Sequence, residues 1–158
     1  MFGVSTAIEL GSRWILAFVF LLSAAIHLSN PYEFMSAIYG YQIGHESIGE
    51  AAAIAIPFLL AGAGGALLFG FAVEAAFSTA IGLLIVFSAA QISVIWRGIT
   101  ADCGCFGMAG SSPVDRHTLV RLGLLLVIAI IGLSLAIARR RFRNLIETTT
   151  PNKLARPA

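Results

Sequence analysis

Four long apolar stretches, separated by polar segments, dominate the pattern of hydrophobic and polar positions along the chain. An α-helix rises about 1.5 Å per residue, so a run of about 20 residues crosses the hydrocarbon core of a bilayer. The second, third and fourth stretches are close to that length, and the first reaches it if its helix begins near Ser5. The pattern therefore predicts an all-α fold, a four-helix transmembrane bundle. The expected helices cover residues 8–28, 51–71, 75–96 and 113–139.

The length of the chain suits one domain, which would hold all four helices within residues 1–143. Residues 144–158 follow as a polar segment that contains prolines. Such a segment buries too little apolar surface to fold, so we expect a disordered cytoplasmic tail.

The first apolar stretch itself covers only about Trp14 to Leu28, short enough to be confused with a signal peptide. However, Glu9 precedes it, and the polar sequence Ser-Asn-Pro-Tyr-Glu follows it in place of a small-residue cleavage site. Arg13 near its start can extend its charge to the membrane surface. We therefore expect a helix that is retained in the bundle.

Composition supports a membrane protein. Of the 158 residues, 58% are hydrophobic and only 11% are charged, against about a quarter charged in an ordinary soluble domain. The mean hydropathy is +0.91, so a lipid bilayer is the expected surrounding and partner of most of the chain. The net charge is only +2, which argues against a nucleic-acid partner.

Basic residues are distributed unequally between the two ends of the expected bundle. Seven of the ten lie on the side of the termini, four of them within residues 139–143. The other three are Arg97, Arg116 and Arg121. The positive-inside rule then predicts that both termini are cytoplasmic, which an even number of spans allows. The loops at 29–50 and 97–118 would face the outside of a bacterial cytoplasmic (inner) membrane, where disulfides persist.

The first of these outer loops contains several aromatic residues, among them Tyr32, Phe34 and Tyr39. Aromatic side chains favour the boundary between lipid and water. We expect a short amphipathic helix, Tyr32–Tyr39, that lies at the membrane surface and covers the second outer loop.

Three polar residues lie near the outer ends of the predicted spans: His27, Glu50 and Gln91. Polar groups inside a membrane are costly and are candidates for function. His27 and Gln91 either gather beneath the second outer loop or lie solvated at the interface. For Glu50, and for Glu74 in the short cytoplasmic turn, we expect solvated side chains.

The second outer loop contains the sequence Asp-Cys-Gly-Cys-Phe-Gly, residues 102–107, with both cysteines of the chain. A disulfide between Cys103 and Cys105 would close a small, strained ring, and Gly104 gives the backbone the freedom that such a ring needs. Strained, exposed disulfides are oxidising and labile, as a catalyst requires. The two cysteines are therefore the predicted redox pair.

Several neighbours would influence these thiols. Ser112, Pro113 and Asp115 form a helix-start signal, which confines the loop to a short segment. A helix N-terminus lowers a thiol pKa if it lies close, and so do basic residues. The basic candidates are Arg97, Arg116 and His117. Asp102 would oppose this effect or accept a proton.

Other uses of the cysteines remain open. They could be buried as small apolar residues, be acylated, or form a structural clip in a non-enzymatic accessory subunit of a larger membrane complex. They could also bind Cu(I) or Zn(II), since thiolates are soft ligands, with His117 as the nearest further ligand.

The sequence from Phe87 to Gly107 resembles the MauE branch of the DoxX-like membrane proteins. In that branch an apolar helix ends in Arg-Gly, here Arg97-Gly98, and leads into the hexapeptide at 102–107. The run that starts at Arg121 is similar to the last helix of the family. The resemblance covers about residues 14–138.

This resemblance implies a four-helix, redox-associated membrane protein. MauE is linked to the maturation of methylamine dehydrogenase, whose small subunit is rich in disulfides, and related proteins are similar to partners of thioredoxin-like proteins. One position departs from the pattern: Pro57 is followed by Phe-Leu-Leu-Ala-Gly, without the acidic residue that such proteins often carry. Proton or quinone chemistry at that position is therefore in doubt.

The expected activity is thiol-disulfide exchange outside the cytoplasmic membrane in support of exported proteins. One cysteine would form a mixed disulfide and the other would resolve it. Because the chain has no second cysteine pair, electrons must pass to another molecule. The candidates are a quinone in the bundle and a thioredoxin-like or other exported protein.

Overall fold

A computed structural model describes residues 2–40, 46–98 and 116–149, and these residues form five α-helices without a strand. The helices are α1 (Phe2–Ser29), α2 (Pro31–Gly40), α3 (Glu46–Phe69), α4 (Val73–Trp96) and α5 (Arg116–Thr149). All except α2 are long and apolar enough to cross a membrane. The predicted all-α, four-helix transmembrane bundle is confirmed.

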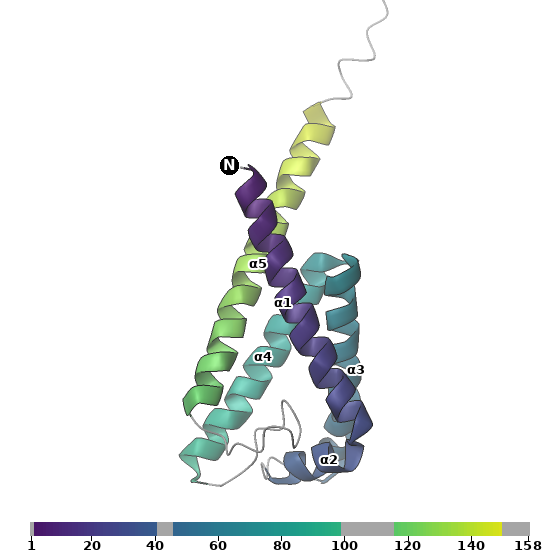
Figure 1. Ribbon diagram of the computed structural model, residues 1–158, viewed down its shortest axis with the longest axis vertical. Helices are drawn as coiled ribbons and strands as arrows, with labels where there is room; N and C mark the ends of the chain where they lie inside the picture. The colour runs from purple at the N-terminus through teal and green to yellow at the C-terminus, as the bar shows by residue number, and fades with distance from the viewer. Residues whose placement is uncertain (1, 41–45, 99–115, 150–158) are drawn as a thin grey trace, which may run out of the picture.

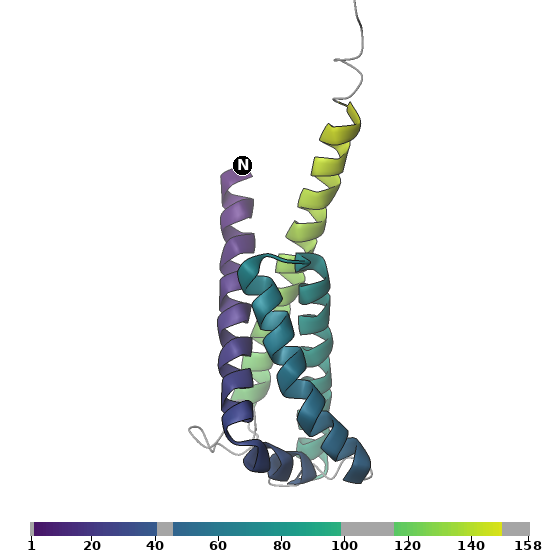
Figure 2. The same ribbon diagram turned by 90° about the vertical axis from the view of Figure 1, so that its right-hand side faces the viewer.

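The four long helices run alternately up and down (Figure 1). α1 packs mainly against α3, and α4 mainly against α5. The turn between α3 and α4 lies at the same end of the bundle as the N-terminus, whereas α2 lies across the opposite end (Figures 1 and 2). We call these the terminal end and the α2 end.

The core of the bundle is formed by apolar side chains from all four long helices. Leu16 and Ala17 of α1 are fully buried, as is Phe77 of α4. α1 therefore contributes directly to the core of the bundle. Large apolar side chains on the outward faces are exposed, Phe18 at 69% among them, because lipid is their natural solvent.

Two glycines allow close helix packing. A Cβ at Gly64 of α3 would lie 3.2 Å from the Cβ of Phe20 and 3.3 Å from the carbonyl oxygen of Ala17. A Cβ at Gly132 of α5 would overlap the ring of Phe77. In lipid the hydrophobic effect does not drive helices together, so their association depends on the close packing that small residues allow.

The last helix differs from the prediction at its C-terminal end. Residues 144–158 are predicted to be disordered, yet α5 continues through Thr149. No glycine or proline follows Gly132 until Pro151. Proline disfavours a helical conformation in the residue before it, so the helix ends where the sequence first breaks it. Residues 150–158 lie outside the described residues.

Candidate functional site

The two transmembrane helices that flank the cysteines both reach the α2 end of the bundle (Figure 1). α4 ends there at Trp96, and α5 begins there at Arg116. The connecting residues 99–115 include Asp102, Cys103, Gly104 and Cys105, and they lie outside the described residues, as does the helix-start signal at 112–115. The chain therefore leaves the bundle and re-enters it at the same end, and its only two thiols lie in the sequence between these two points.

α2 confirms the short helix that was predicted at Tyr32–Tyr39. Its Phe34 is buried, and the Phe34 ring stacks on the imidazole of His27 with a centroid distance of 4.0 Å. On the other side, a Cβ at Gly49 of α3 would lie 3.4 Å from Tyr39 Cε1. α2 is thus packed against the ends of α1 and α3, next to the face from which residues 99–115 depart.

His27 and Gln91 are both buried, at 3% and 1% exposure. They belong to the interior of the bundle, not to a solvated interface. His27 Nε2 and Ser23 Oγ share a hydrogen bond of 3.2 Å one turn apart on α1. Buried polar groups in a membrane protein are held in place by such bonds. Glu50, in contrast, is exposed, as predicted.

Basic residues stand on both sides of the cysteine segment. Arg97 follows α4, is exposed, and its backbone N–H donates to Ser93 O at 3.1 Å. The next residue, Gly98, has φ +63, a left-handed conformation that favours glycine. Arg116 begins α5, and His117 is exposed in the first turn. Positive groups at this face would favour thiolates over thiols.

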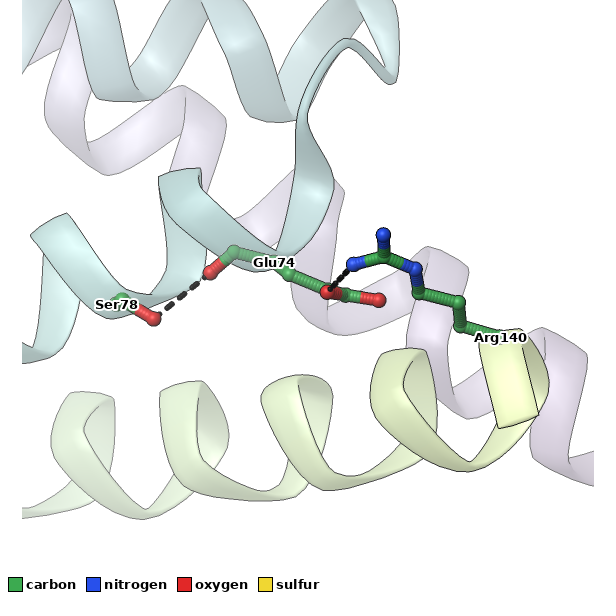
Figure 3. A network of polar contacts seen from close by, with 3 residues as sticks. All are labelled: Glu74, Ser78 and Arg140. Carbon is green, nitrogen blue, oxygen red and sulfur yellow. Dashed lines mark hydrogen bonds and ion pairs between the residues drawn. The ribbon is translucent and has the colours of Figure 1, made fainter.

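A second polar cluster, at the terminal end, was missed by the sequence reasoning. The buried carboxylate of Glu9 pairs with Arg139 at 2.9 Å. Glu74, which was expected to be solvated, pairs with Arg140 at 2.6 Å and accepts a bond from Ser78 Oγ at its backbone carbonyl (Figure 3). Two features of the sequence indicate charged groups at this end: Glu9 before the first apolar stretch, and the arginines within 139–143. The sequence alone does not show which acidic residue pairs with which arginine.

The turn between α3 and α4 completes this cluster. Nε and Nη2 of Arg13 donate to the carbonyl oxygen of Leu67 at 3.1 and 2.9 Å. Gly70, with φ +74, leaves room for the guanidinium, since a Cβ there would lie 2.6 Å from Nη2. Arg13 therefore fixes the end of α3 against α1.

Metal binding stays a prediction. Among the described residues no group of three or more His, Cys, Asp and Glu side chains is placed to hold a metal ion. The predicted alternative ligands are Cys103, Cys105 and His117, and both cysteines lie outside the described residues.

One comparison with known proteins gives a match. A family model described as "Methylamine utilisation protein MauE" matches residues 5–135, which include all four predicted spans in whole or in large part. No curated protein and no solved structure matches the chain.

Proposed function

The chain belongs to the MauE family, and we propose that it carries out thiol-disulfide exchange at the outer face of the bacterial cytoplasmic membrane. One observation supports this proposal above the others. Both thiols of the chain lie in the single segment that joins α4 to α5, and the helix ends on either side of it share one face of a membrane bundle. A soluble partner can reach a segment at that face without entering lipid.

The reaction is a two-electron exchange. A thiolate of a client dithiol attacks the Cys103–Cys105 disulfide, so that one S–S bond breaks and a mixed disulfide forms. The second thiolate of the client then attacks the mixed disulfide. The client dissociates with a disulfide of its own. Cys103 and Cys105 remain in the chain as a dithiol that has taken up two electrons and two protons.

The oxidised state must be restored by a second reaction. A thioredoxin-like protein would do so by exchanging its own disulfide, and a quinone would accept two electrons and two protons to become a quinol. The chain holds no further cysteine pair to relay these electrons. We therefore propose a partner-dependent protein, in which Arg97, Arg116 and His117 increase the thiolate fraction and Asp102 accepts a proton.

The buried pair of polar residues near this face has a supporting role in the proposal. His27 lies two residues before the end of α1 and Gln91 five residues before the end of α4, so both are buried close to the α2 end of the bundle. Both are in the part of the helices that would lie within the membrane. A quinone, if it is the acceptor, would approach from the membrane. His27 would then offer a hydrogen-bond donor or acceptor to a quinone oxygen.

The exchange is tested by trapping the mixed disulfide. Cells that express Cys103→Ser or Cys105→Ser are quenched in acid, the remaining thiols are alkylated, and the protein is separated without reductant. One of the two variants should accumulate an adduct of higher mass that dithiothreitol releases. The variant with both substitutions is the control and should form none.

The same variants separate the other interpretations. Equal absence of adducts from both single variants, with unaltered thiol states in exported proteins, contradicts the exchange. Stoichiometric copper or zinc that is lost in either variant would instead indicate a metal site. A complex of fixed composition that survives the loss of both cysteines would indicate an accessory subunit.

A further inference from the structure

A cavity of about 580 Å³ opens at the terminal end, between α1, the α3–α4 turn and α5. Its charged lining comes from Glu9, Arg13, Glu74, Arg139, Arg140 and Arg143. The volume falls in the usual range of small-molecule sites, about 300–1,000 Å³. The residues that line it belong to the terminal end, whereas α4 ends and α5 begins at the opposite, α2 end (Figure 1), so the cavity is a separate site.

The lining has an excess of positive charge. Four arginines and two carboxylates line the cavity, and Glu9 pairs with Arg139 and Glu74 with Arg140, so the charges of Arg13 and Arg143 are not balanced within the lining. Arg13 donates two of its N–H groups to a backbone carbonyl, which hydrogen-bonds the guanidinium but does not neutralise it. Arg143 is exposed. An anion would compensate these two charges.

The ends of the candidate membrane spans put the cavity near the expected level of the membrane surface. The turn that lines it ends one transmembrane span and begins the next. On that turn Phe69 and Phe71 are 85% and 77% exposed, and exposed apolar side chains beside basic residues can insert at the boundary between headgroups and acyl chains. A ligand in this cavity is therefore surrounded by lipid headgroups on one side and by protein on the other.

We propose that this cavity binds the phosphate group of an anionic phospholipid from the leaflet at the terminal end. Guanidinium groups match phosphate in geometry and charge, and basic pockets between membrane helices bind anionic headgroups. The acyl chains would lie along the exposed apolar surface of the bundle, to which Phe69 and Phe71 contribute. Arg143 and Arg13 supply the positive charges that select an anionic over a zwitterionic lipid.

The binding is tested with two charge-matched variants of α5. Arg143→Gln removes a charge that lines the cavity, whereas Arg141→Gln removes an exposed charge two residues away that does not. Neither side chain is buried, so both variants are expected to fold. The purified chain in detergent is titrated with phosphatidylglycerol or with phosphatidylcholine, and bound lipids are counted by native mass spectrometry.

The wild type and Arg141→Gln should bind phosphatidylglycerol alike and in preference to phosphatidylcholine. Arg143→Gln should weaken phosphatidylglycerol binding about fivefold, the effect of one arginine near a lipid surface. Equal weakening by both variants, or no preference for the anionic lipid, would overturn the proposal. Inorganic phosphate is added as a competitor, and displacement at the same concentration as the lipid would assign the site to a soluble anion instead.

Discussion

At the scale of single residues, burial separates the two ion pairs of the terminal end. The side chain of Glu9 is 6% exposed and that of its partner Arg139 is 40% exposed. In the other pair, Glu74 and Arg140 are 31% and 70% exposed. Water can solvate Glu74 when its partner is removed, but it reaches Glu9 poorly. The first pair should therefore matter more for folding than the second, although it is the longer of the two.

Replacing Arg139 by Gln should lower the free energy of unfolding by about 1–3 kcal/mol, because it leaves a buried carboxylate without its charged partner. The same substitution at Arg140 should cost about 1 kcal/mol or less, as for exposed ion pairs. Thermal unfolding of the purified protein in detergent measures both.

The control is the double variant Glu9→Gln, Arg139→Gln, which removes the buried charge as well and should recover most of the lost stability. Equal unfolding temperatures for Arg139→Gln and Arg140→Gln would show that burial of Glu9 does not determine the strength of this pair.

At the scale of helices, the long apolar runs and the short aromatic helix were predictable, since both depend on local composition. The contacts between helices were not. Gly64 of α3 packs closely against α1, but Gly62 of the same helix and Gly82 of α4 are exposed, with no neighbour within 4 Å of a Cβ among the described residues. Which face of a uniformly apolar helix turns inward is decided by packing, because lipid and core are equally apolar.

Gly132 provides a test of this packing. Gly132→Ala should lower the unfolding temperature in detergent by about 5 °C, because the added methyl group overlaps the buried ring of Phe77 and overpacking costs about 1–3 kcal/mol. Gly123→Ala, on the same helix but with open space around its Cβ, is the control. It should leave the unfolding temperature unchanged or raise it. A similar decrease in both variants would point to a general effect of alanine in α5.

At the scale of the whole molecule, the charged side chains of the described residues lie toward the two ends of an apolar bundle. The α2 end holds the docked helix α2, the buried His27 and Gln91, and the helix ends that flank the cysteine segment. The terminal end holds the ion pairs and the basic cavity. This division follows from the bilayer, which tolerates charged groups only near its surfaces.

The sequence was informative about this division but not about its details. Both cysteines, Arg97 and His117 were identified from a short motif and its flanks. The pairs Glu9–Arg139 and Arg140–Glu74 join residues far apart in the chain, and no periodicity within one helix indicates such contacts. His27 was a candidate from its position alone, but its stacking on Phe34 depends on how α2 folds back onto α1.

The most direct test of the central claim is a redox titration of the cysteines with a reagent that cannot cross the membrane. Intact cells are equilibrated in dithiothreitol buffers of graded potential and treated with a charged maleimide, and the alkylated thiols of Cys103 and Cys105 are counted by mass. Cys103→Ser, with one thiol, serves as the control without a disulfide. We predict that both thiols become reactive together, in one two-electron transition with a slope of about 30 mV per tenfold change in the ratio of dithiol to disulfide. We also predict that the reagent reaches both thiols from the outside of the cell. Thiols that are alkylated at every potential, or only after the membrane is permeabilised, would contradict the account.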